Sequence, residues 1–244
     1  MSLDSISLDS IPRLGLRRSE EGGPFSPGVL PTGFASLDRY LPGAGWPLGA
    51  LTEILTRRNG IGELALLMPA LRVVTGSGRW TLWIAPPHLP FAPALEAHGV
   101  APGRVLWLAP PGRQTAAARD LGGRPEGRMG KAEVSSPSAG DYLWAAEQAL
   151  RSAACGAVLL WSECLGLHLG DKALRRLQLA AEASRSWAVL FRAARWQRLP
   201  SPAALRLLVQ GAAPGTSEAP DRVGSRISIL KCRGRMPPAG AILL

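Results

Sequence analysis

Two glycines, an acid and a leucine stand where a phosphate-binding loop would carry its chemistry. Segment 51–74 has the pattern of a short apolar strand, a glycine-containing turn and a helix, which is the frame of such a loop. Gly60 and Gly62 would let backbone N–H groups curl around phosphate oxygens. However, Glu63 replaces the expected lysine and Leu64 replaces the magnesium-binding Ser or Thr. A carboxylate there repels phosphate by roughly a few kcal/mol at low effective dielectric. The segment therefore predicts a degenerate phosphate-binding loop.

The two acids that a nucleotide hydrolase needs are also missing from their expected places. The magnesium-binding acid should end the apolar run 157–161, which ends in Trp161 instead. The water-activating acid should follow the run 80–85, which continues into two prolines. Glu163 is either a substitute metal ligand or an ordinary loop carboxylate. We therefore expect no enzyme activity, no metal and no cofactor, and we expect Glu63 to stabilise the first turn of its own helix.

Short, nearly continuous apolar runs recur along the chain, and helical patterns lie between most of them. Such runs are typical of strands covered on both faces, so they predict an α/β fold with a mostly parallel sheet flanked by helices. The runs after Arg198 lack intervening helices and predict an antiparallel C-terminal edge. Asp141 is expected to cap its helix. The expected strands are 51–55, 80–85, 105–109, 157–161, 187–191, 205–209, 227–230 and 241–244, and the expected helices are 64–74, 92–98, 141–154 and 171–185.

Two stretches fall outside this rhythm. Residues 1–27 mix Pro, Gly, Ser and charge and include a tandem repeat of Ser-Leu-Asp-Ser-Ile, so they are either a frayed terminus or a flexible arm that orders on a partner. The stretch 113–140 is rich in Gly, Arg, Ser and Pro and predicts a disordered insertion in a domain spanning 28–244. The candidate docking residues of the arm are Leu3, Ile6, Leu8 and Ile11.

The chain is strongly basic, with a formal net charge of +10 over 244 residues. Such a charge favours contact with nucleic acid or an acidic partner, although an arginine-rich composition from a GC-rich genome explains it equally well. Basic residues gather in segments 171–198 and 222–235, where the alternative is a solvated face. Lys231 and Arg233 alternate at strand spacing and are expected to share one face. The candidate DNA or partner contacts are Arg192, Arg195, Arg226, Lys231, Arg233 and Arg235.

The cysteine content and the hydropathy of the chain indicate its cellular compartment. The three cysteines are odd in number and are not spaced as metal ligands, which favours a reducing compartment. No apolar run approaches the roughly 18–20 residues that a membrane span needs. The N-terminus lacks the basic-then-apolar order of a secretion signal. We therefore expect a cytoplasmic protein without a membrane partner.

Several motifs, taken in order, resemble a known family. Segments 32–38 (Thr-Gly-Phe-Ala-Ser-Leu-Asp) and 49–54 (Gly-Ala-Leu-Thr-Glu-Ile) resemble the entry to the RecA recombinase core. Segment 154–162 resembles its second nucleotide-binding strand without the acid, and segment 227–233 resembles a late strand with a basic pair near the subunit interface. The sequence Gly-Ile-Gly-Glu-Leu in place of the lysine motif, together with segment 200–206, narrows the resemblance to ImuA proteins.

This resemblance covers residues 32–244 apart from the insertion, and it implies a RecA-like core. ImuA proteins are RecA-like members of bacterial mutagenesis cassettes, sometimes described as SulA-like division inhibitors. The resemblance implies a damage-induced, non-catalytic factor of error-prone translesion synthesis. Its partners would be RecA, ImuB (an inactive relative of Y-family polymerases) and an error-prone C-family polymerase, with DNA as a further candidate and the nucleoid as a location after damage. Two alternatives are a single-stranded DNA-binding modulator of RecA filaments and a SulA-like inhibitor of cell division.

Overall fold

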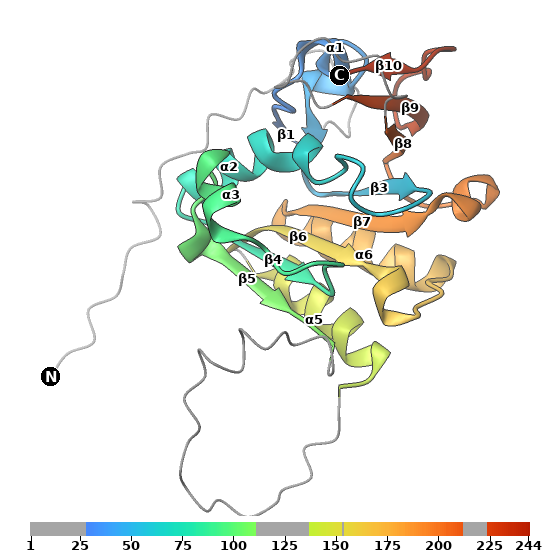
Figure 1. Cartoon of the computed structure of the whole chain (residues 1–244). Coiled ribbons are helices and arrows are strands. Elements are labelled where there is room, and N and C mark those ends of the chain that lie inside the picture. Colours follow the sequence, from blue (N-terminus) through green and yellow to red (C-terminus); the bar gives the residue numbers. More distant parts are fainter. Residues whose placement is uncertain (1–27, 111–136, 153, 212–223) are drawn as a thin grey trace, which may run out of the picture.

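The computed structural model describes residues 28–110, 137–152, 154–211 and 224–244 (Figure 1). The predicted arm at 1–27, with Leu3, Ile6, Leu8 and Ile11, lies outside the described residues, as does most of the predicted insertion at 113–140. The end of that insertion was placed too late, because residues 139 and 140 already belong to a helix.

An eight-stranded sheet forms the centre of the molecule, in the order β10-β9-β8-β3-β7-β6-β4-β5. The six strands from β8 to β5 are parallel, and β9 and β10 run antiparallel to their neighbours. A separate pair, β1 with β2, lies beside α1 (Figure 1). The strands are β1 Val29–Leu30, β2 Trp46–Pro47, β3 Ala50–Thr56, β4 Trp80–Ile84, β5 Val105–Leu108, β6 Cys155–Trp161, β7 Trp187–Ala193, β8 Leu205–Gly211, β9 Ser225–Cys232 and β10 Ile242–Leu243.

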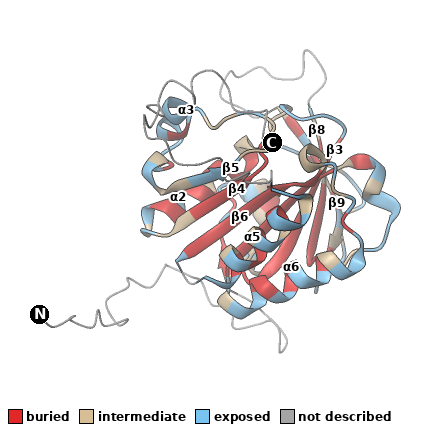
Figure 2. Ribbon diagram, turned by 90° about the horizontal axis from the view of Figure 1, so that it is seen from below, coloured by how far each residue is buried: buried red, intermediate tan, exposed pale blue. Residues whose placement is uncertain are grey.

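Helices cover both faces of this sheet. The α-helices are α1 Ala35–Asp38, α2 Met68–Gly76, α3 Ala92–Ala97, α5 Ala139–Arg151 and α6 Asp171–Ser184. The 3-10 helices are η2 Pro42–Ala44, η3 Ala65–Leu67, η4 Pro102–Arg104, η5 Ser162–Leu165 and η6 Ala194–Arg198. Helices α5 and α6 lie together across one face, and the buried strands run behind them (Figure 2). The predicted α/β class, with a mostly parallel sheet flanked by helices, is confirmed.

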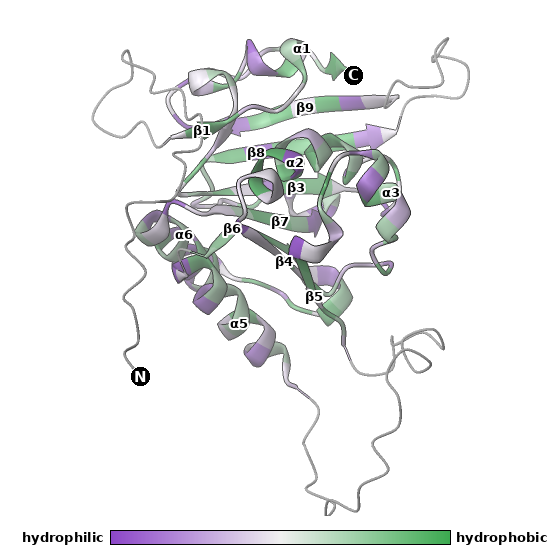
Figure 3. Cartoon of the chain, turned by 90° about the vertical axis from the view of Figure 1, so that its left-hand side faces the viewer, coloured by the Kyte–Doolittle hydropathy of each residue, from purple (hydrophilic) through white to green (hydrophobic). Residues whose placement is uncertain are grey.

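The apolar runs of the sequence reflect burial on both faces. Alternate residues of one strand enter different clusters: Trp187 and Val189 of β7 pack on the α2 side, whereas Ala188 and Leu190 pack on the α5–α6 side. The central strands are accordingly hydrophobic over most of their length, and hydrophilic residues lie mainly on the helices and at strand ends (Figure 3). This two-sided burial is why the strands lack an alternating pattern.

The predicted antiparallel C-terminal edge is confirmed, except that β8 does not belong to it. Strand β8 pairs in parallel with β3, with Leu205 opposite Thr52, and in antiparallel with β9. The connection from β7 passes through η6 and crosses back to the other end of the sheet, so β8 runs in the same direction as β7. The antiparallel edge therefore consists of β9 and β10 alone.

The start of α5 differs from the expected cap at Asp141. The N-cap is Ser138, whose Oγ accepts a hydrogen bond from the Asp141 backbone N–H, while the Asp141 carboxylate accepts one from the Ser138 N–H at 2.7 Å. The two residues form a capping box, and the Ser138 hydroxyl and then the Ser138 N–H, which both donate to the Asp141 carboxylate, lower its pKa. Asp141 is the third residue of the helix and pairs with the Ser138 cap, so the helix begins two residues earlier than predicted.

Candidate functional site

The loop between β3 and η3 keeps the backbone shape that its glycines suggested. Gly60 and Gly62 have φ of 78° and 97°, in the left-handed region that side chains rarely adopt. The loop leaves the carboxyl end of a central parallel strand, which is the position where ligands bind in open α/β sheets. A turn with two left-handed glycines therefore follows β3, and its descent from a phosphate-binding loop stays a prediction.

The Glu63 side chain occupies the inside of this loop. Its carboxylate accepts hydrogen bonds from the backbone N–H groups of Gly60 and Ile61, each at 2.8 Å, and the residue is only 4% exposed. Adjacent amides converging on one anion form a nest of the kind that binds phosphate. The expected role in a first helical turn is wrong in detail, because Glu63 precedes η3 and binds the loop instead. The loop therefore binds a carboxylate of its own chain, that of Glu63, at the place where it would bind a phosphate.

The other two replaced positions are packed as core. Leu64 is the N-cap residue of η3 and lies against the larger apolar cluster. Trp161 is 3% exposed and stacks on Phe191, with ring centroids 4.4 Å apart and planes 5° apart. Among the residues that the structure describes, no group of three or more His, Cys, Asp or Glu side chains is placed to hold a metal ion.

Three protein groups bind the Glu163 carboxylate. Its oxygens accept hydrogen bonds from Trp196 Nε1 at 2.7 Å and from the Ala193 N–H at 3.4 Å, and Arg195 forms an ion pair with it. These contacts tie η5 to η6 at the carboxyl ends of β6 and β7. Of the two readings of Glu163, they favour the loop carboxylate, because these donors already engage both oxygens.

A pocket of about 210 Å³ lies between the β3 loop, η5 and the end of β7. Its rim is basic: Arg57 and Arg58 are exposed, directly follow β3, and make no ion pair with any residue in the described part of the chain. Its floor includes the stacked Trp161 and Phe191. The lining residues are Thr56, Arg57, Arg58, Asn59, Trp161, Glu163, Cys164, Phe191, Arg192, Ala193 and Arg195.

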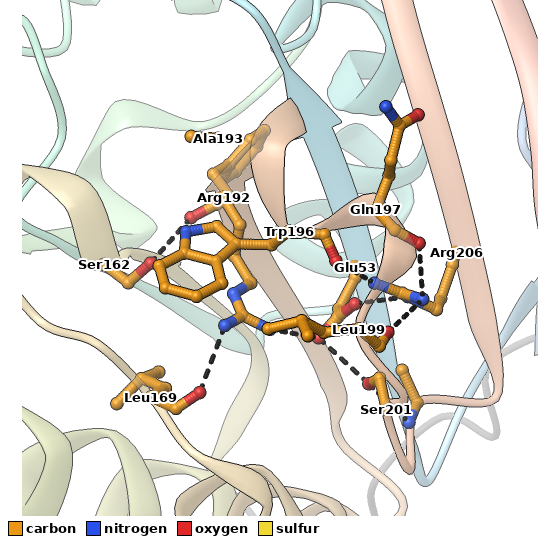
Figure 4. A network of polar contacts seen from close by, with 12 residues as sticks. Glu53, Ser162, Leu169, Arg192, Ala193, Trp196, Gln197, Leu199, Ser201 and Arg206 are labelled. Atoms are coloured by element: carbon orange, nitrogen blue, oxygen red, sulfur yellow. Dashed lines mark hydrogen bonds and ion pairs between the residues drawn. The ribbon is translucent and has the colours of Figure 1, made fainter.

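A buried charge cluster supports one wall of this pocket (Figure 4). Glu53 is fully buried; Arg192 Nη1 lies 3.1 Å from one carboxylate oxygen and Arg206 Nε lies 2.6 Å from the other. Ser201 Oγ donates to the same carboxylate at 3.0 Å. One acid cannot neutralise two guanidinium groups, so this Glu53 triad carries a net positive charge. We define the Glu53 triad as Glu53, Arg192 and Arg206.

The triad also fixes the segment that carries η6. Arg206 donates to the backbone carbonyls of Trp196 at 3.0 Å and Leu199 at 2.9 Å, and Arg192 donates to the carbonyl of Leu169 at 3.1 Å (Figure 4). The Arg192 guanidinium also lies over the Trp196 ring, 5.1 Å from its centroid. The two arginines thus satisfy carbonyls of an irregular segment that covers the sheet beyond α6.

Arg192 was predicted as a surface contact, and that prediction is wrong. It is 4% exposed and paired with Glu53 in the sheet, so it cannot reach a partner. Arg195 is exposed, as expected, although it pairs with Glu163. Sequence reasoning missed Arg57, Arg58 and the triad partners Glu53 and Arg206. The available signals were charges inside apolar strand runs and a double arginine directly after a strand.

The four basic candidates of the C-terminal segment do not form one patch. Arg226 lies opposite Gln210 at the carboxyl end of β8, whereas Lys231 lies opposite Arg206 near its start, about 17 Å away for five strand residues. Lys231 is half-buried and donates to the Ser201 carbonyl at 2.6 Å; burial lowers its pKa, with Arg233 and Arg206 adding to the effect. The remaining two, Arg233 and Arg235, are exposed in the turn after β9.

Comparison with known proteins adds no relative. No protein-family model matches the chain, and no curated protein matches it. Within the described residues, no helix is both long and apolar enough to cross a membrane. The geometry of the loop, the pocket and the triad is therefore the basis for a function.

Proposed function

We propose that this protein is a non-catalytic, RecA-like accessory factor of damage-induced, error-prone translesion synthesis. It acts through protein contacts with RecA and an ImuB-type subunit, alongside an error-prone C-family polymerase. The observation that carries this proposal is the Glu63 carboxylate inside the amide nest of the β3 loop. A nucleotide phosphate would have to displace the buried Glu63 side chain, which is held by two hydrogen bonds. That side chain is negatively charged, as the phosphate is.

The positions around the nest support the same reading. A phosphate bound there would also need a cation and a metal, but Trp161 belongs to the core and Leu64 packs against it. The fold has kept the strand, the glycine turn and the following helix, while the chemical groups have been replaced. A protein with this history serves as a scaffold whose surfaces, and not its nucleotide, carry the function.

The motif that resembles the RecA entry has a structural role that fits a retained core. Thr32 Oγ1 donates to the Asp38 carboxylate at 2.7 Å, which closes the turn around α1. Gly33 has φ of 86°, and a Cβ placed on it would lie 2.4 Å from Pro69 Cβ at the start of α2. The motif therefore docks the N-terminal segment on α2, and these residue types are needed there whether or not nucleotide is bound.

Co-purification tests this proposal. Full-length protein is mixed with purified RecA, with the ImuB-type subunit, and with both, in the absence of nucleotide. We expect a complex with at least one of them, and we expect a variant lacking residues 1–27 to show whether the predicted arm contributes. If neither partner is retained while the protein binds single-stranded DNA alone, the DNA-binding alternative replaces the proposal. Cell filamentation on overexpression without DNA damage would instead point to the division inhibitor.

A further inference from the structure

The pocket beside the β3 loop has more positive charge than its own residues neutralise. Four arginines line it, but Arg192 pairs with the buried Glu53 and Arg195 pairs with Glu163, so the charges of Arg57 and Arg58 are left without a counter-charge among the described residues. Glu163 is already engaged by Arg195, Trp196 and Ala193. Arg57 and Arg58 project from the rim without an ion pair in the described part of the chain. The rim therefore offers charged donors to an anion that the protein does not supply.

Donors also exceed acceptors in the pocket wall. Trp161 Nε1 and Arg192 Nε are buried N–H groups that have no hydrogen-bond acceptor among the described residues. Both belong to residues that line the pocket. Buried donors without partners are uncommon in folded proteins, and two of the eight unpartnered buried side-chain atoms among the described residues lie in this lining.

The floor of the same pocket is apolar and closed to base stacking. Trp161 and Phe191 are each 3% exposed and stack on one another. The Trp196 ring has the Arg192 and Arg195 guanidinium groups at 5.1 and 5.4 Å from its centroid. Sites for single-stranded nucleic acid pair a basic track with aromatic faces on which bases stack, and no such face is free here.

We propose that this pocket binds an acidic–aliphatic peptide segment of a protein partner, with a carboxylate held by Arg57 and Arg58. Arginine binds carboxylates through a planar fork of donors, and the half-buried Cys164 and Ala193 of the lining suit an aliphatic side chain next to the acid. A phosphodiester provides no apolar group for these two residues. The inference rests on the proposed function, since it names a surface for one of its protein contacts.

Fluorescence anisotropy with the full-length protein tests this inference. The probe is a labelled peptide of alternating Asp and Leu; its Asn–Leu counterpart and a labelled single-stranded oligonucleotide serve as comparisons. The test variant is Arg57→Ala/Arg58→Ala. The matched control is Arg39→Ala/Arg72→Ala, which removes the same charge from exposed arginines after α1 and in α2.

We expect the Asp–Leu peptide to bind the wild type and to bind the Arg57→Ala/Arg58→Ala variant roughly tenfold or more weakly, because charged hydrogen bonds are the strong ones. The control should bind within about twofold of the wild type. Equal weakening in both variants, equal binding of the Asn–Leu peptide, or no peptide binding overturns the inference. So does an oligonucleotide that binds and displaces the peptide.

Failure of this inference is separable from failure of the proposed function. If RecA or the ImuB-type subunit still co-purifies while the peptide does not bind the pocket, only the peptide site is wrong. If the peptide binds through Arg57 and Arg58 while neither partner co-purifies, the pocket stands and the translesion role falls.

Discussion

Removing the charge of Glu53 should destabilise the protein strongly. Glu53 is fully buried, and its two partners Arg192 and Arg206 are almost as deeply buried, with side chains 4% and 7% exposed. The substitution Glu53→Gln keeps the size and one acceptor oxygen but leaves two guanidinium groups in the interior without a counter-charge. Removing one partner of a buried ion pair costs about 3–5 kcal/mol, and we expect the loss in the free energy of unfolding to fall in this range.

The size of this loss makes it easy to measure. Domains of this kind are stable by about 5–15 kcal/mol, so the substitution would remove a large share. For a chain of this length it corresponds to a drop in Tm of roughly 6–20 °C. Because Arg206 holds the carbonyls of Trp196 and Leu199, the same substitution should loosen the segment that carries η6.

Urea unfolding followed by tryptophan fluorescence provides the assay, with two comparison variants. Arg175→Ala breaks an ion pair with Asp171 whose side chains are 69% and 56% exposed, and it should cost less than about 1 kcal/mol. The triple variant Glu53→Leu/Arg192→Met/Arg206→Leu should be more stable than Glu53→Gln, since apolar groups can replace a buried charge cluster. A Glu53→Gln protein as stable as the wild type would refute this account of the triad.

Three further predictions concern single side chains. Glu63→Ala leaves the amides of the β3 loop without their acceptor, and we expect a loss of about 1–3 kcal/mol in urea unfolding, with no change contradicting the nest. Ser138→Ala removes the N-cap of α5 and should cost about 1 kcal/mol, which calorimetry would detect and which an unchanged Tm would exclude. Burial raises the pKa of the Cys232 thiol to about 11, whereas the pKa of a thiol in an unfolded chain is about 8.5. The folded state therefore retains a proton that the unfolded chain loses, so this stabilisation is complete below about pH 8.5 and disappears as the pH rises toward 11. The wild type should lose more stability than Cys232→Ala over that range, and parallel losses would contradict the assignment.

The sequence was informative wherever burial is two-sided. The runs that became β3, β6 and β7 could be recognised because central parallel strands are apolar along most of their length. The direction of β8 could not be recognised, because an apolar run looks the same in either direction. It depends on how the chain crosses after η6.

Charged side chains were harder to place than strands. Arg192 looked like part of a basic surface because its acidic partner, Glu53, lies 139 residues away in the sequence. Glu63 was recognised as the wrong residue for phosphate, but its bonds to Gly60 and Ile61 depend on the loop conformation. The local sequence pattern predicts which charged residues are unusual for their positions. Only the fold shows which groups these side chains bind.

The most direct test of the central claim is the affinity of the full-length protein for the ImuB-type subunit, measured with and without saturating ATP and magnesium. Because Glu63 already fills the nest of the β3 loop, we predict the same Kd under both conditions and no release of phosphate. A Kd that changes with ATP, or turnover that disappears in a Gly62→Val variant, would contradict the claim that this protein works without nucleotide.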